Sequence, residues 1–150
     1  MRIRNHRSVD FAAFFVAAVF AVAFSGSCSV PNLEAPECTE SRGTVKEFYS
    51  IHFGNEMKYS PESLKSKEKF LTPELIASLA ATPAGTDPFT TGSADLPKAF
   101  RVGGCTIADP SKTEVEIVLF WKDESRSEER KIHAEVVKRD DKWLINKILN

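Results

Sequence analysis

Apolar residues between positions 44 and 57 recur every three or four residues, which is the spacing of an amphipathic helix. The apolar face of this segment consists of Val45, Phe48, Tyr49, His52 and Phe53. Thr44 and Glu47 have the spacing of a capping box, so we expect the helix to begin at Thr44. We expect it to end near Gly54, or at the latest at Met57.

Two further helix starts follow along the chain. Ser60-Pro61-Glu62 and Thr72-Pro73-Glu74 each place a hydroxyl at the N-cap, a proline at the first helical position and an acid in the first turn. Behind these starts, the apolar positions are Leu64, the stem of Lys67 and Phe70-Leu71, and then Leu75, Ile76, Leu79 and Ala80 up to Pro83. The sequence therefore predicts three short helices.

The second half of the chain alternates between apolar and polar residues, which is the pattern of strands with one buried face. Strands are predicted at residues 100–102, before a bulge at Gly103-Gly104, and at 114–122, 131–139 and 143–149. The predicted inward residues are Val115, Ile117, Leu119 and Trp121, then Ile132, Ala134 and Val136, and finally Trp143, Ile145 and Leu149. A charged turn at 123–129 and a hairpin turn at Asp140-Asp141 connect the last three strands.

Residues 82–98 form a long loop between the helices and the strands. The loop is rich in Thr, Gly, Ser, Asp and Pro, and Phe89 is expected to pack from it onto the core. Loops of this length inside a compact domain are uncommon and are often functional or mobile. Helices followed by an antiparallel meander predict an α+β fold, in which N-terminal helices pack on one face of a curved antiparallel sheet.

The N-terminus has a different composition from the rest of the chain. Five of the 11 Phe fall in residues 11–24, a stretch without any charge. Arg2, Arg4 and Arg7 precede this stretch, and Ser25-Gly26-Ser27 follows it. These are the features of a secretory signal peptide, and the stretch is shorter than the roughly 20 apolar residues of a membrane-spanning helix. We therefore expect an exported protein rather than a cytosolic enzyme or a polytopic membrane protein.

Ser25-Gly26-Ser27-Cys28 resembles a bacterial lipobox, in which the cysteine is acylated and becomes the mature N-terminus. Ser25 departs from that pattern, because Leu is usual three places before the cysteine. Ordinary cleavage after Ser27 or Ala23 is the alternative. The resemblance implies a signal peptide at 1–27, a lipidated cysteine and tether at 28–38, and one domain at 39–150. It also implies a periplasmic site on the outer membrane, whereas ordinary cleavage would give a soluble periplasmic or secreted protein.

If Cys28 carries lipid, two cysteines are left, and an even number in an oxidising compartment favours a disulfide between Cys38 and Cys105. The alternative is a buried free thiol at Cys105 and an exposed one at Cys38. No pair of Cys or His shows the spacing of a zinc site, and no Gly-rich phosphate loop is present, so we expect neither a metal nor a cofactor.

The net charge of the chain argues against binding to nucleic acid. The predicted signal peptide holds three Arg and one Asp, so its removal leaves 17 basic and 20 acidic side chains and a net charge of −3. Mild acidity gives no reason to expect binding to nucleic acid.

The order of elements resembles the nuclear transport factor 2-like superfamily, in which a bent sheet wraps a long N-terminal helix to form a cone. The carrying motifs are Val45-x-x-Phe48-Tyr49, Leu71-Thr72-x-x-Leu75 and the closing hairpin of residues 136–145. Asp87-Pro88-Phe89 followed by Phe100-Arg101-Val102-Gly103 is similar to an uncharacterised bacterial family of that superfamily, whose members are exported and often lipidated. The resemblance covers nearly all of residues 42–149 and implies a fold and a location, but no agreed activity.

Enzymes of that superfamily work in the open mouth of the cone, and four residues are candidates for such a site. His52 could act as a base or be a core histidine with one hydrogen bond, and Tyr49 shares its face. Asp87 could be a pocket acid or only initiate a turn before proline. Arg101 could bind an anion or pair with Glu114 or Glu116 on the surface. No Asp–His, Ser–His–Asp or Cys–His arrangement can be read from the sequence.

Two functions therefore remain open. The first is a non-catalytic, envelope-anchored module that binds an envelope protein or a small ligand, with the charged run at 122–130 as one possible contact site. The second is a small pocket enzyme of isomerase or cyclase type. The second function requires that Tyr49, His52, Asp87 or Arg101 converge around an enclosed cavity.

Overall fold

The computed structural model describes residues 33–55, 57, 59–83 and 85–150. Residues 34–150 belong to one compact unit, which holds all the helices and strands given below. The predicted signal peptide and Cys28 lie outside the described residues. Among the residues that the structure describes, no helix combines the length and the apolar run that crossing a bilayer demands.

The first described helix, α2 (Pro36–Gly54), begins eight residues before the predicted start at Thr44. Pro36 stands at the beginning of the helix, where its missing N–H costs no hydrogen bond, and Glu37 lies in the first turn. Thr44 is therefore not an N-cap, and its hydroxyl donates to the carbonyl of Glu40 inside the helix. The last three residues of the segment assigned to the tether, 36–38, belong to this helix.

The two other predicted helix starts are confirmed. Helix α3 (Pro61–Lys65) is capped by Ser60, whose hydroxyl accepts from the backbone N–H of Ser63, and α4 (Pro73–Ser78) is capped in the same way by Thr72. Both helices are shorter than predicted. Each is followed by a 3₁₀ turn, η1 (Glu68–Phe70) and η2 (Leu79–Ala81) respectively.

The four strands are β1 (Ala99–Asp109), β2 (Lys112–Lys122), β3 (Ser127–Arg139) and β4 (Lys142–Leu149), and they form one antiparallel sheet in the order β1-β2-β3-β4. The register of β1 on β2 shifts between Val102 and Cys105, which confirms the predicted bulge at the two glycines. Asp140 and Asp141 both have positive φ, at 48° and 60°, as a tight hairpin turn requires. The charged turn is shorter than predicted, because β3 already begins at Ser127.

One predicted inward residue is wrong. Trp143 and Ile145 are buried, but Leu149 does not join the core. The register of β3 on β4 shifts so that Glu135 and Val136 face Lys147 and Ile145, which leaves one extra residue in β4. The extra residue reverses the alternation beyond it. Ile148 therefore packs against the core in place of Leu149.

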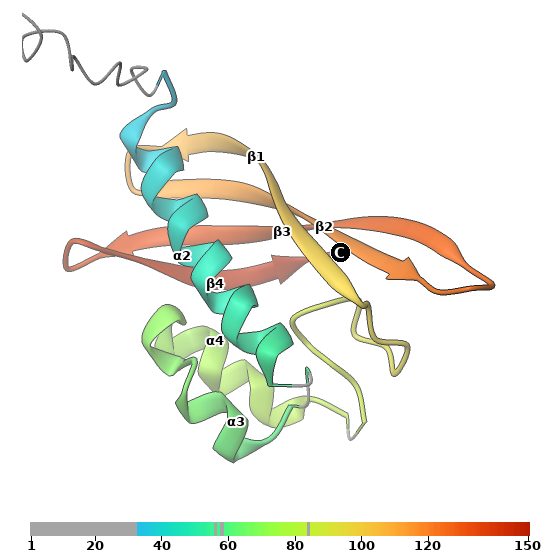
Figure 1. Cartoon of the computed structure of the whole chain (residues 1–150). Coiled ribbons are helices and arrows are strands. Elements are labelled where there is room, and N and C mark those ends of the chain that lie inside the picture. Colours follow the sequence, from blue (N-terminus) through green and yellow to red (C-terminus); the bar gives the residue numbers. More distant parts are fainter. Residues whose placement is uncertain (1–32, 56, 58, 84) are drawn as a thin grey trace, which may run out of the picture. The chain divides into compact units, whose positions relative to one another are not determined.

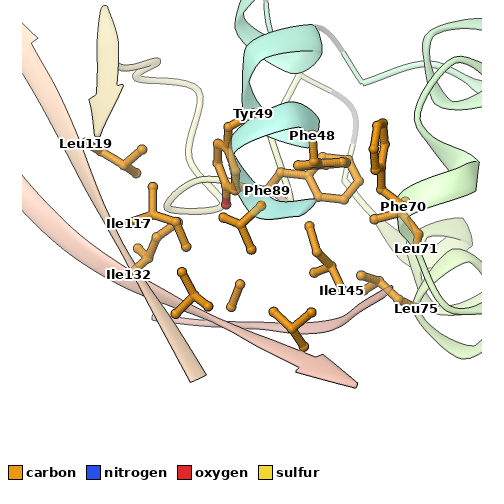
Figure 2. Close-up of a cluster of buried hydrophobic side chains, with 14 of the residues drawn as sticks. Phe48, Tyr49, Phe70, Leu71, Leu75, Phe89, Ile117, Leu119, Ile132 and Ile145 are labelled. Carbon is orange, nitrogen blue, oxygen red and sulfur yellow. The ribbon is translucent and has the colours of Figure 1, made fainter. Parts of the chain in front are cut away.

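The core lies between α2 and one face of the sheet (Figure 1). Figure 2 shows Phe48 and Tyr49 of α2 above Ile117, Leu119 and Ile132 of the sheet, with Leu71 and Leu75 closing one side near Ile145. The segment before α4 also joins the edge of β4, where the N–H of Thr72 donates to the carbonyl of Ile145 over 3.0 Å. The α+β prediction, with N-terminal helices packed on an antiparallel sheet, is confirmed.

Candidate functional site

His52 projects from the last turns of α2 into the core and is fully buried. Its imidazole lies among aromatic rings, stacked on Phe48 at 5.8 Å and edge-on to Phe89 at 5.2 Å between ring centroids. Its Nε2 is 2.8 Å from Oδ2 of Asp87, and its Nδ1 is 3.1 Å from Nζ of Lys67. His52 is thus a core histidine with two polar partners instead of one.

Asp87 comes from the long loop of residues 82–98 and is 1% exposed. Its second carboxylate oxygen, Oδ1, accepts from the backbone N–H of Phe89 over 3.0 Å, and its carbonyl accepts from the N–H of Gly92 over 3.1 Å. Asp87 therefore stabilises the turn that it begins, as one alternative predicts, and its other carboxylate oxygen also contacts His52. The structure thus contains an Asp–His pair that could not be read from the sequence.

Lys67 is the third member of this cluster, and the apolar pattern of the sequence predicts only a buried stem for it. It lies between α3 and η1 with an exposed fraction of 0%. Its Nζ also lies 5.6 Å from the centroid of the Phe89 ring. The available signal was its position in the apolar spacing of Leu64, Lys67 and Phe70, which indicates a buried stem but not a buried ammonium group.

The three polar groups fix one another's roles. An ionised Asp87 only accepts, so Nε2 of His52 donates to it, Nδ1 of a neutral ring accepts, and Lys67 donates. Burial lowers the pKa of Lys67 from its ordinary value, and the nearby charge of Asp87 partly offsets that effect. In this assignment, one buried cation and one buried anion balance across a neutral imidazole. We refer to Asp87, His52 and Lys67 as the buried relay.

Tyr49 lies one turn before His52 on α2 and belongs to the same region. Its hydroxyl donates to the carbonyl of Phe89 over 2.6 Å, and its side chain is fully buried. Burial, and after it the charge of Asp87, raises the pKa of Tyr49 well above its ordinary value, so the phenol stays protonated at physiological pH. Tyr49, His52 and Asp87 therefore do converge, as buried side chains within the packed core.

Arg101 is not part of this buried cluster and is exposed on β1. Its charge acts on Glu116, whose pKa it helps to lower, while Lys131 forms the actual ion pair with Glu116 over 2.7 Å. Glu114 pairs with His133 in the same way. Arg101 therefore remains available to a ligand on the surface.

Arg101 lines an open groove of about 490 Å³ between α2 and β1. The groove is lined by Glu34, Thr39, Arg42, Gly43 and Lys46 from the α2 side and by Phe100, Arg101 and Val102 from β1. We call it the α2–β1 groove. Two contacts bound it, since a disulfide joins α2 to β1 at Cys105 and aromatic rings join them at Phe100.

The disulfide links Cys38 and Cys105, with 5.7 Å between the Cα atoms and a sequence separation of 67. The pairing predicted from the sequence is present in the structure, and the alternative of two free thiols is not. Within the described residues, no group of His, Cys, Asp or Glu is arranged to hold a metal ion.

No protein-family model matches the chain, and no curated protein matches it. Two solved structures are similar. One is a protein of unknown function from Bacteroides thetaiotaomicron VPI-5482, with 24% identity, a TM-score of 0.52, and 75% of this chain and 90% of that chain covered. The other is described as an Ntf2-like, potential transfer protein, TraM, from the Gram-positive conjugative plasmid pIP501, with 16% identity, a TM-score of 0.49, and coverage of 75% and 94%. The likeness to the Bacteroides protein concerns the fold alone.

Proposed function

We propose that this chain is a non-catalytic binding module, exported and anchored to the cell envelope through a lipid on Cys28. One observation carries the binding part of the proposal. The residues best suited to acid–base chemistry, His52 and Asp87, are 0% and 1% exposed and bind each other. A general acid or base must come within hydrogen-bond reach of its substrate, and nothing outside the core reaches these two groups.

The geometry of the surface supports the same proposal. The open α2–β1 groove is lined by Arg101 but by none of Tyr49, His52 and Asp87. An enzyme of isomerase or cyclase type would need its titratable groups to line the space that the substrate enters. A second hollow, lined by Tyr59 and Thr86 among others, also lacks Tyr49, His52 and Asp87. The buried cluster is thus separate from both spaces, so we assign it to the stability of the fold and the α2–β1 groove to binding.

Two features support export. A basic N-terminus, an uncharged apolar stretch and a small-residue exit precede Cys28. The Cys38–Cys105 disulfide suits an oxidising compartment such as the periplasm. Membership of an exported family of the nuclear transport factor 2-like superfamily, as the sequence motifs imply, belongs to this proposal.

A test of the binding proposal compares the wild-type chain with His52→Gln and Asp87→Asn. Each protein is incubated with an extract of small metabolites from cells, and the extract is then profiled by mass spectrometry. We expect the same profile for all three proteins, and altered thermal unfolding for the variants. A metabolite that is converted by the wild type and not by a folded variant, as judged by circular dichroism, would contradict the proposal.

A test of the anchor uses Cys28→Ser in the full chain expressed in a diderm bacterium. We expect the wild type in the membrane fraction with the mass of an acylated chain that starts at Cys28. The variant should lose the acyl mass and leave the membrane fraction, because the buried acyl CH₂ groups contribute about 0.8 kcal/mol each to attachment. A wild-type chain without acyl mass would overturn the anchor and leave ordinary cleavage.

A further inference from the structure

The sheet has an open edge at β1. In the order β1-β2-β3-β4, this strand pairs with β2 alone. Every second residue of an edge strand points its N–H and C=O away from the sheet, where a further strand can bind them. In the described part of the chain, no backbone hydrogen bond other than those to β2 engages Ala99–Asp109. This edge is therefore unpaired along its length.

The α2–β1 groove runs along this open edge. Phe100, Arg101 and Val102 all line it. Successive residues of a strand point to opposite faces of the sheet, and Arg101 lies opposite Val118 while its neighbours lie opposite Leu119 and Ile117. Because the groove touches residues of both orientations, we place it along the edge of β1. The unpaired backbone groups therefore border the groove.

The groove has an excess of positive charge. Arg42, Lys46 and Arg101 contribute three cations, against the single carboxylate of Glu34, which pairs with Arg42 over 2.8 Å. Among the described residues, neither Lys46 nor Arg101 has an ion-pair partner within 4.0 Å. The Nε of Arg42 is buried without a hydrogen-bond acceptor in the described chain. Unpaired donors and cations at one place favour a ligand with carboxylates.

The groove also offers apolar contact. Phe100 and Val102 are only partly buried and pack against the edge of the core. On one strand, therefore, a basic side chain alternates with two apolar ones. An added strand meets these side chains in register, since its own residues alternate with the same period of two. Lys46 lies on the α2 side, which Phe100 and Val102 face, whereas Arg101 points to the other face of β1. The complementary strand therefore carries acidic residues on both of its faces.

We propose that the α2–β1 groove binds an extended acidic segment of a partner protein, which adds to β1 as a fifth strand and places its carboxylates on Lys46 and Arg101. This inference names the partner class of the binding module and so rests on the proposed function. Strand addition supplies affinity through the backbone, while the cations select among sequences. The disulfide and the ring contacts both tie α2 to β1 beside the groove.

The test uses fluorescein-labelled peptides and fluorescence anisotropy with the oxidised, folded chain. The Glu–Val peptide is a heptapeptide with three successive Glu residues between two Val residues at each end, so that it presents carboxylates on both faces of an added strand. The Lys–Val peptide has Lys in place of each Glu, and a third peptide is the Glu–Val peptide with N-methyl groups at every second residue. We expect saturable binding of the first peptide only. Methylation removes the donors that pair with an edge strand, so it should weaken binding by about tenfold or more.

Variants of the protein locate the site. Lys46→Glu and Arg101→Glu should each weaken binding of the Glu–Val peptide by about five- to tenfold, because each places a like charge against the peptide. Lys142→Glu is the matched control, since Lys142 is exposed on β4 at the far side of the sheet, and its affinity should equal that of the wild type. Circular dichroism and thermal unfolding check that each variant is folded.

Three results would overturn the inference: equal binding of the Lys–Val peptide, no effect of N-methylation, or no effect of the two groove variants. Binding that tolerates N-methylation but fails in the variants would indicate a site for carboxylate groups alone, without strand addition. None of these results touches the proposal of a non-catalytic module, which is decided by the metabolite profile of the His52 and Asp87 variants.

Discussion

The imidazole Nε2 of His52 lies 2.8 Å from Oδ2 of Asp87, although 35 positions separate the two residues in the chain. Both side chains are inaccessible to solvent, and Lys67 completes the line on the other side of the ring. This relationship joins α2, the segment after α3 and the long loop at one point. It also accounts for the order of that loop, whose composition alone would suit a mobile segment.

Replacing Asp87 with Asn should destabilise the fold strongly. The substitution removes the anion and leaves the buried charge of Lys67 without a partner, which typically costs about 3–5 kcal/mol. Urea unfolding followed by circular dichroism measures the change. The matched control is Asp95→Asn, which removes a half-exposed ion pair with Arg126 and should cost no more than about 1 kcal/mol. Equal effects of the two substitutions would show that the buried relay carries no charge.

Replacing Lys67 with Met keeps the apolar stem and removes the cation. Alone, it should destabilise the fold, because Asp87 then stays buried without a counter-ion. In the double variant with Asp87→Asn, both charges are gone, so the loss should fall short of the sum of the two single losses by about 1–3 kcal/mol. Unfolding free energies of the four proteins complete the cycle. Simple additivity would mean that the two charges do not interact.

Stability should fall at alkaline pH because of Tyr49. Its raised pKa means that its contribution is fully present below pH 10, the unfolded value, and is lost as the pH rises towards the folded value. The slope attributable to one such group reaches about 1.4 kcal/mol per pH unit. Between pH 9 and 11, the free energy of unfolding should therefore fall less steeply with pH for Tyr49→Phe than for the wild type. Equal slopes for Tyr49→Phe and the wild type would contradict the prediction.

Breaking the disulfide should destabilise the oxidised chain by about 4 kcal/mol, because it releases the long loop that the bridge closes in the unfolded state. The measurement compares unfolding with and without a thiol reductant, and the double variant Cys38→Ser, Cys105→Ser with the wild type. The reductant should leave the double variant unchanged, which separates the bridge from general effects of the reagent. A wild type as stable when reduced as when oxidised would contradict the prediction.

The strands are the most predictable part of the fold, because a sheet with one buried face requires apolar residues at alternate positions. Val115, Ile117 and Leu119 are all fully buried, as their pattern predicts. The exception is Leu149. A single extra residue in β4 reverses which face of the sheet the later side chains point to, and no residue type in β4 marks that position.

Helix starts are less predictable where tertiary contacts compete with local signals. Thr44 and Glu47 have the spacing of a capping box, yet the helix extends through them back to Pro36. The earlier turns bury Cys38 and Ser41 against the sheet, and the disulfide fixes them there. Burial and a covalent bond outweigh a cap that contributes roughly 1 kcal/mol.

The buried relay is the least predictable feature. Tyr49, His52 and Asp87 are each candidates from the sequence, but their meeting depends on how a long loop returns to the core, which local patterns do not encode. Lys67 escapes prediction because lysines rarely bury their ammonium group. The sequence therefore identifies three of the four polar groups and leaves their arrangement, and hence their stabilising role, to the structure.

The buried relay also sets an order of events. Burial of the Asp87 carboxylate is favourable only with His52 and Lys67 as its partners, so we expect the part of the loop around Asp87 to dock after the helices have met. Contacts that form after the transition state act on the rate of unfolding and leave the rate of folding nearly untouched. We therefore expect Asp87→Asn to shorten the lifetime of the native state while leaving the rate of folding nearly unchanged.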